Sequence, residues 1–217
     1  MKNLTTKIKD KKNHKPLRFL TATSLFDGHD AAINVIRRLI QSKGAEVVHL
    51  GHNRSVCEVV RAAIQEDVDG IAISSYQGGH MEYFTYLLEL LKENSAEHIK
   101  VFGGGGGTIS LEEIKLLESA GVSRIYHPEQ GMEMGLVGMI DDLFQIVRSG
   151  VKEERASIHQ TDHLNLYSKV DIDDEIIISE AISAIENRNI PADSFKKLKN
   201  KWKKSALERP VIGITGT

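Results

Sequence analysis

The sequence contains a single cysteine, Cys57, among 217 residues. One thiol cannot form an intrachain disulfide, and it cannot supply the cysteine pair of a CxxC metal site. A lone thiol is typical of a protein in a reducing compartment. Disulfide-stapled scaffolds and paired-cysteine metal centres are therefore excluded.

Long apolar runs and an excess of charge of one sign are also missing. No stretch approaches the ~20 apolar residues that a membrane helix needs, and the lysine-rich start, residues 1–15, lacks the apolar core of a signal peptide. A formal net charge of −2 gives no reason to expect nucleic acid or an acidic membrane surface as a partner. We expect a cytoplasmic protein in which residues 1–15 form a basic, flexible tail.

The composition is otherwise ordinary for a globular protein, with 41% hydrophobic and 27% charged residues. Over residues 16–150, short apolar runs alternate with segments of helical spacing. Five such strand–helix units predict an open parallel sheet with helices on both faces. The predicted strands cover residues 17–23, 45–50, 70–74, 99–102 and 122–126. We therefore predict an α/β, flavodoxin-like, doubly wound five-stranded sheet with strand order 2-1-3-4-5.

The pattern changes after residue 150, and we predict a helical linker over residues 151–208. Residues 151–168 are polar, whereas 172–187 and 193–207 have helical spacing. The second of these helices is rich in lysine, which is more typical of a solvated face than of a binding patch. The first carries an apolar stripe that has to pack against the domain or a neighbour. The stripe consists of Ile176, Ile177, Ile178, Ala181, Ile182 and Ile185.

Ligands of such sheets bind at the carboxyl ends of the strands, near the point where the strand order reverses. In the predicted order this point lies between the first and third strands. The first strand is followed by Asp27-Gly28-His29-Asp30. A metal-ligating histidine normally donates its second ring nitrogen to a carboxylate, and Asp27 is the candidate partner of His29. On this segment alone, the more economical interpretation is that Asp27 or Asp30 caps the next helix and that His29 is solvated.

The loops after the third and fourth strands are poor in side-chain bulk. Residues 74–80 read SSYQGGH, in which small residues would let a ligand approach the backbone. A simple helix cap with an exposed His80 is the alternative. The fourth strand runs into five glycines, 103–107, whose ordering cost is best explained by a bulky ligand in the space that side chains would fill. A phosphate loop is improbable, because no Lys-Ser or Lys-Thr pair follows the glycines and because Thr108 stands where the GxGxxG motif needs its last glycine.

Taken together, these three loops resemble the DxHxxG…SxL…GG pattern of cobalamin-binding domains. The resemblance implies that His29 replaces the dimethylbenzimidazole base as lower axial ligand of cobalt, and that the nucleotide tail threads past Ser74 towards paired glycines. Two residues depart from the pattern: Ala32 stands in place of glycine and Tyr76 in place of leucine. The implied cofactor-binding residues are Asp27, Gly28, His29, Asp30, Ser74, Tyr76, Gly78, Gly103, Gly104, Gly106, Gly107 and Tyr126, with His29 as the metal ligand.

Further features resemble the acyl-CoA mutase branch of this family, whose cofactor is adenosylcobalamin. They are the stretch SSYQGGH, the run IYHPEQG and the lack of an attached helical cap. Residues 209–217, RPVIGITGT, look like the start of a truncated P-loop GTPase domain. This order resembles the fused isobutyryl-CoA mutases, in which a GTPase chaperone lies between the cobalamin and substrate domains.

The resemblance implies a role in the isobutyryl-CoA/n-butyryl-CoA carbon-skeleton rearrangement. Acyl-CoA would bind to a missing barrel domain, GTP and Mg²⁺ only to the missing downstream domain, and the full protein would be a homodimer. This chain alone would bind cofactor without turnover. Three alternatives remain: a corrinoid carrier of a methyltransferase system, a signal receiver domain, and a zinc site formed by His29, His80 and Asp27. A receiver domain would need an aspartate after the third strand, where Ser74 and Ser75 stand.

Overall fold

The computed structural model describes residues 16–154, 167 and 174–206. The predicted tail (1–15), most of the predicted polar linker and the suggested P-loop start (209–217) lie outside these residues. Five strands form one sheet: β1 (Arg18–Ser24), β2 (Glu46–Arg54), β3 (Gly70–Ser74), β4 (Lys100–Gly104) and β5 (Arg124–Tyr126). The described helices are α1 (Ala31–Ser42), α2 (Val56–Gln65), α3 (His80–Glu93), α4 (Leu111–Ala120), α5 (Pro128–Glu154), α7 (Glu175–Glu186) and α8 (Ala192–Ala206).

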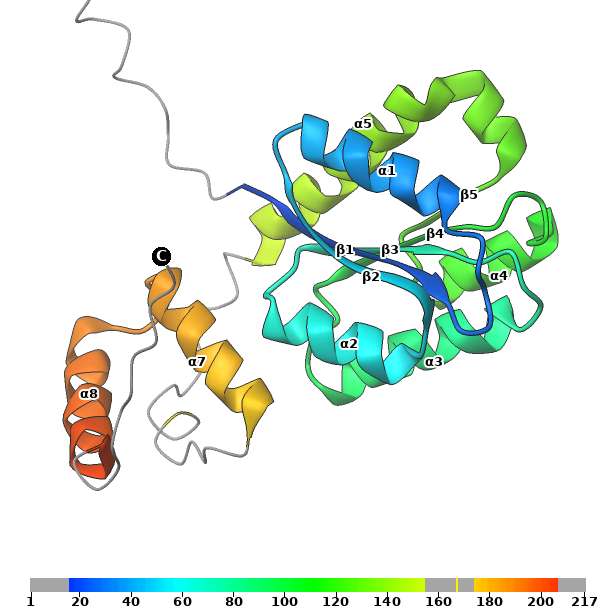
Figure 1. Cartoon of the computed structure of the whole chain (residues 1–217). Helices are drawn as coiled ribbons and strands as arrows, with labels where there is room; N and C mark the ends of the chain where they lie inside the picture. The colour runs from blue at the N-terminus through cyan, green and yellow to red at the C-terminus, as the bar shows by residue number, and fades with distance from the viewer. Residues whose placement is uncertain (1–15, 155–166, 168–173, 207–217) are drawn as a thin grey trace, which may run out of the picture.

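All strand pairs of the sheet are parallel, and the order is β2-β1-β3-β4-β5. This confirms the predicted doubly wound, flavodoxin-like fold. Helices α1 and α5 cover one face, and α2, α3 and α4 cover the other (Figure 1). The carboxyl ends of β1, β3 and β4 therefore meet at one edge, as parallel pairing requires.

Side-chain alternation along the strands divides the interior into two cores. Phe19, Ala72 and Phe102 face α1 and α5, whereas Leu20 and Ile71 face α2, α3 and α4. Each of these residues is at most 5% exposed. Strands buried on both faces become continuous apolar runs, which is why the sequence pattern locates them well.

The helices after β2 and β4 begin with the same local motif. Ser55 and Ser110 are N-caps whose hydroxyls accept a hydrogen bond from the backbone of Glu58 and Glu113, and each glutamate accepts from its serine's backbone N–H. These capping boxes satisfy amide groups that the first helical turn leaves free. Both helices therefore start at defined positions beside the carboxyl edge of the sheet.

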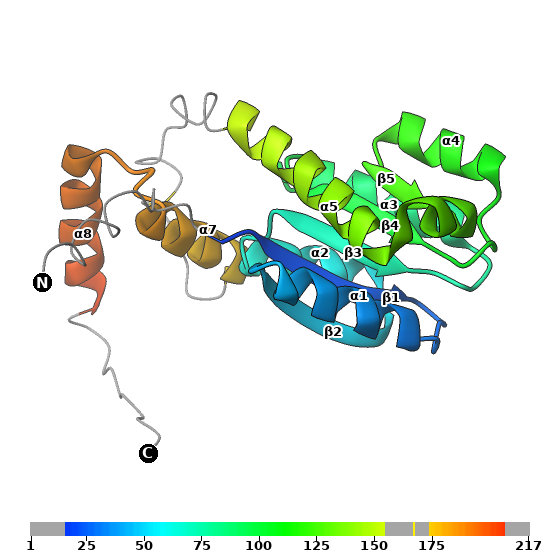
Figure 2. The same ribbon diagram turned by 90° about the horizontal axis from the view of Figure 1, so that it is seen from above.

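The C-terminal helices α7 and α8 pack on each other around a small core of their own, which includes Ala181, Ala184 and Leu198. Figure 2 shows α7 next to α2, with α8 farther from the sheet. The predicted apolar stripe is only partly covered: Ile176 packs on the core beneath α2, whereas Ile182 is 52% exposed. Among the described residues, no helix is long and apolar enough to cross a bilayer.

Candidate functional site

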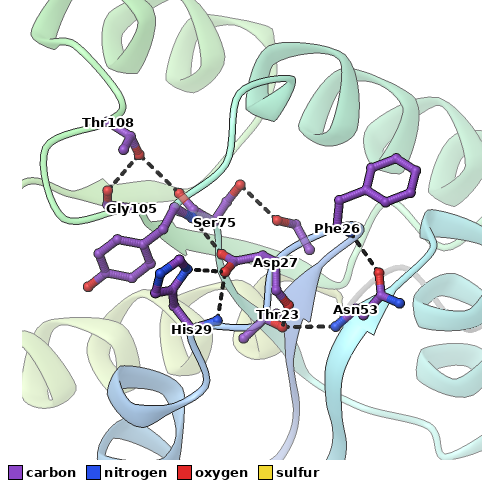
Figure 3. A network of polar contacts seen from close by, with 10 residues as sticks. Thr23, Phe26, Asp27, His29, Asn53, Ser75, Gly105 and Thr108 are labelled. Carbon is purple, nitrogen blue, oxygen red and sulfur yellow. Dashed lines mark hydrogen bonds and ion pairs between the residues drawn. The ribbon is translucent and has the colours of Figure 1, made fainter.

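The Asp27 side chain is fully buried at the end of β1 and accepts three hydrogen bonds. Its Oδ1 atom accepts from the backbone nitrogen of His29 at 2.8 Å and pairs with His29 Nδ1 at 2.9 Å. Its Oδ2 atom accepts from the backbone nitrogen of Tyr76 at 2.6 Å. The carboxylate thus joins the loop after β1 to the loop after β3 (Figure 3).

These contacts determine the protonation of the pair. Burial opposes ionisation of Asp27, but the hydrogen bonds from Tyr76 and His29 outweigh it and hold the pKa of the carboxyl below its ordinary value. An ionised carboxylate only accepts hydrogen bonds, so His29 Nδ1 must donate the proton. The lone pair of the neutral imidazole is then on Nε2, the atom that a metal would bind.

A polar network behind Asp27 holds the loop in place. The Thr23 hydroxyl donates to the backbone oxygen of Asp27 at 2.8 Å, and the backbone nitrogen of Asn53 donates to the same oxygen at 3.1 Å. Ser24 and Ser75 share a hydrogen bond of 2.9 Å between their hydroxyls. Thr23, Asn53 and Ser75 were not predicted as site residues from the sequence, because their role depends on contacts between separate strands.

The helix-capping interpretation of this loop is wrong. Helix α1 has Asp30 as its N-cap, but the Asp30 side chain makes no capping hydrogen bond, and Asp27 bonds to His29 and Tyr76 instead. The His29 side chain is 66% exposed, so its imidazole is accessible. Residues 16–154, 167 and 174–206 contain no cluster of three metal-binding side chains. The proposed zinc site therefore does not form; His80 is buried and lies near Glu113.

A cavity of about 550 Å³ opens between the sheet and helices α1 and α5. Its lining includes half of the predicted site residues: Ser74, Tyr76, Gly103, Gly104, Gly106 and Tyr126. The predicted residues Gly28, Asp30, Gly78 and Gly107 do not line it. Asp27 and His29 are not part of the lining either. The centre of the His29 ring, however, lies 5.7 Å from the centre of the Tyr76 ring, and Tyr76 lines the cavity. The site therefore combines an exposed imidazole with an adjoining deep cavity.

Much of the remaining wall of the cavity is apolar and comes from helices α1 and α5, and Ala72, Ile73 and Phe102 of the strands contribute as well. The helical residues of the lining were not predicted as site residues, because helical core positions carry no sequence signal for ligand contact. They are Ile33 and Ile36 of α1, and Met132, Leu136, Met139, Ile140 and Leu143 of α5. A largely apolar cavity with a few polar groups is typical of a small-molecule or cofactor site.

The five glycines of residues 103–107 are not all required for the same structural reason. A Cβ atom at Gly103 would lie 2.5 Å from Phe84, one at Gly105 would lie 2.2 Å from the backbone oxygen of Ser75, and one at Gly106 would lie 2.1 Å from the Tyr76 ring. The protein's own atoms fill those spaces. At Gly104 the nearest atom is the backbone oxygen of Tyr126 at 3.5 Å. Gly104 therefore lines the cavity and also leaves room for an added side chain, which would enter the cavity.

Tyr126 closes the cavity at the β5 end. Its hydroxyl donates to Asp142 of α5 at 3.0 Å. Burial first, and then the negative charge and hydrogen bond of Asp142, raise the pKa of Tyr126 above its ordinary value, so the phenol stays protonated. This bond holds α5 against the sheet beside the cavity.

Several known proteins are similar to this chain. Residues 17–134 match the model of the B12 binding domain. The chain is 52% identical over 206 residues to the fused isobutyryl-CoA mutase of Cupriavidus metallidurans, an alignment that covers 93% of this chain and 18% of that protein. It is 32% identical over 119 residues to the pivalyl-CoA mutase small subunit of Xanthobacter autotrophicus, covering 55% of this chain and 78% of the subunit.

Structural similarity agrees at the level of the fold. A cobalamin-binding protein from Desulfitobacterium hafniense superposes with a TM-score of 0.51 at 18% identity, over 61% of this chain and 60% of that one. The chain spans only about a fifth of the length of the fused mutases that it matches. The family match, by contrast, covers more than half of this chain and includes Asp27, His29 and most of the residues that line the cavity. The chain therefore belongs to the B12-binding domain family.

Proposed function

We propose that this chain is the cofactor-binding part of an adenosylcobalamin-dependent acyl-CoA mutase of the fused isobutyryl-CoA mutase kind. Its 52%, 46% and 48% identity to three fused isobutyryl-CoA mutases supports this choice. The corrinoid carrier alternative predicts methyl transfer, which none of these relatives is named for. In the proposed arrangement residues 16–150 bind the cofactor, and residues 151–208 connect them to a GTPase and a substrate domain.

The observation that carries the proposal is the His29–Asp27 pair beside the cavity. We infer that His29 Nε2 is the lower axial ligand of cobalt, because Nδ1 is held by a buried carboxylate and the ring is exposed. The displaced nucleotide tail would enter the cavity past Ser74 and Gly104. A dimethylbenzimidazole base is flat and apolar, which fits walls formed by Ile33 and Met139.

Adenosylcobalamin, when bound, supplies a weak cobalt–carbon bond from which radical rearrangement of an acyl-CoA can start. The residues of this chain ligate and orient the cofactor. Asp27 keeps the proton on Nδ1, the Tyr76 backbone keeps Asp27 in place, and α1 and α5 exclude water from the tail. In the full protein, parts other than residues 16–206 would form the substrate site, the GTP site and the homodimer interface.

The test uses cob(II)alamin bound to the full chain. Uniform ¹⁵N labelling of the protein alone should convert the nitrogen triplets of the electron paramagnetic resonance spectrum to doublets, because the axial nitrogen then comes from His29. The His29→Ala variant should lose this splitting, and the His52→Ala variant, which changes an exposed histidine at the end of β2, should keep it. Triplets that persist in labelled wild-type protein would show that the cofactor keeps its own base, and the proposal would be wrong.

A further inference from the structure

His80 begins α3 and is only 8% exposed, although it follows a loop with two exposed glycines, Gly78 and Gly79. Its Nδ1 atom lies 3.4 Å from the backbone oxygen of Gln77. Its Nε2 atom lies 3.3 Å from Glu113 Oε1, an ion-pair distance without the alignment of a hydrogen bond. A buried imidazole that faces a carboxylate on another helix needs an explanation, because burial of a polar group without a partner is costly.

Glu113 serves two functions with its two oxygens. Its Oε2 atom accepts hydrogen bonds from the backbone nitrogen and the hydroxyl of Ser110, each at 2.8 Å, and so caps α4. Its Oε1 atom faces His80. The matched capping box of α2 has Glu58 in the same role, but there the second oxygen pairs with Arg54 on the neighbouring exposed surface. The histidine contact is therefore not part of helix capping itself.

The two residues stand where the loops beside the cavity end. His80 ends the loop after β3, which carries Tyr76, and Glu113 belongs to the helix that follows the loop after β4, which carries the glycines. At the strand end the loops are already joined, because the backbone nitrogen of Ser75 donates to the backbone oxygen of Gly104 at 2.8 Å. The Thr108 hydroxyl, farther along the glycine loop, also donates to the backbone oxygen of Ser75 at 3.2 Å. Between the two ends, Gly106 and Gly107 are exposed and have positive φ angles of 56° and 94°.

We propose that His80 and Glu113 form a latch that holds the Tyr76 loop and the glycine loop at a fixed separation, which makes His80 a positioning residue for the cofactor's nucleotide tail. The inference rests on the proposed function, because it takes the cavity to be the tail site. Without the latch the Tyr76 ring would no longer be held over Gly106. The tail would then have to order both loops as it binds, and this ordering would weaken its affinity.

The experiment compares cobalamin with cobinamide, which keeps the corrin ring and lacks the tail. Dissociation constants of both are measured by absorption titration for the wild-type chain and for His80→Leu and Glu113→Gln. The Glu113→Gln variant keeps an oxygen that can cap α4 but loses the carboxylate that faces His80. Each variant should lower the preference for cobalamin over cobinamide by roughly three- to tenfold, since about one or two ordered groups are freed.

Two controls separate a latch from a general loss of stability. In the His80→Gln variant, the amide nitrogen reaches close to the position of Nε2. This variant should therefore keep most of the preference for cobalamin over cobinamide. Glu58→Gln, the equivalent change in the α2 capping box, should keep the wild-type preference within about twofold. If His80→Leu weakens both ligands equally, or neither, the latch is wrong. If the wild-type chain itself does not prefer cobalamin, the tail site of the proposed function fails, and the latch fails with it.

Discussion

The Asp27 carboxylate is fully buried, and three N–H groups compensate for its lost hydration. Two of them come from His29 and one from Tyr76, which is 49 positions away in the sequence. The carboxylate is therefore both an orienting partner of the imidazole and a tie between two loops. Its neighbour Asp30, by contrast, makes no side-chain capping bond.

The Asp27→Asn variant should bind cobalamin roughly 10–100-fold more weakly, the usual effect of losing such a partner of a metal-ligating histidine. The amide has a similar shape but no negative charge to hold the proton on His29 Nδ1. Affinity is measured by absorption titration, and circular dichroism checks the fold. Glu97→Gln removes the same charge at an exposed position between α3 and β4 and should leave the affinity unchanged; equal affinities of the two variants would contradict the role of Asp27.

Gly104 offers a second test at this scale, because its added side chain would enter the cavity rather than the protein's own core. Gly104→Leu should leave the circular dichroism spectrum intact and weaken cobalamin binding by about 1–3 kcal/mol, the usual cost of overfilling a packed site. Cobinamide should bind as it does to the wild-type chain. A variant that binds cobalamin with unchanged affinity would show that the tail does not pass Gly104.

Among the elements, α5 departs most from regular geometry. It runs from Pro128 to Glu154, but Gly135 has φ 66° and ψ 163°, and the helix is kinked there. The segments on both sides of the kink line the cavity, through Met132 and Leu136 respectively. The kink therefore lets one helix cover the cavity along two directions.

Gly135→Ala should lower the free energy of unfolding by about 1–3 kcal/mol, because this backbone conformation is open almost only to glycine. No heavy atom would lie within 4 Å of the new Cβ, so the cost would come from the backbone alone. The measurement is urea unfolding followed by circular dichroism. Gly131→Ala changes a helical glycine of the same element and should instead raise stability slightly. The same sign for both variants would contradict the interpretation of the kink.

In the molecule as a whole, the described residues form three cores, which belong to two parts: the sheet domain and the α7–α8 pair. The sheet and its helices enclose one on each face, and α7 and α8 enclose a smaller one around Leu198. The two parts meet where α7 lies against α2, through Arg61 and Glu175 and through Ile176. The described lining of the cavity contains no residue of α7. Helices α1 and α5, which cover the cavity, lie on the opposite face of the sheet from α2, the helix that α7 contacts (Figure 1).

Leu198→Ala should therefore destabilise the α7–α8 pair by about 2–5 kcal/mol, the range for truncating a buried leucine, and leave cobalamin affinity unchanged. Leu198 is 1% exposed. The chain has one tryptophan, Trp202, which packs against this core and reports on its unfolding by fluorescence. The exposed Lys199 provides the control variant Lys199→Ala. A parallel loss of cobalamin affinity in Leu198→Ala would mean that the α7–α8 pair is coupled to the sheet domain.

The succession of elements, the parallel sheet and the strand order could be predicted from the sequence, because fully buried strands and amphipathic helices leave local patterns that need no distant partner. The sequence also located His29 and Asp27 at the correct edge, since in a parallel sheet the loops after β1 and β3 must meet there. Gly103 to Gly107 were recognised as a special segment for a similar local reason: no packed loop tolerates five glycines without cause.

The contacts of those residues could not be predicted in this way. The bond from Tyr76 to Asp27, the contact of His80 with Glu113, and the direction in which each glycine would project all depend on distances between separate segments. Sequence spacing along one segment carries no information on such distances. The cavity is the clearest case, because it is the space left between α1, α5 and the sheet after every side chain has packed, and no single stretch of sequence encodes that space.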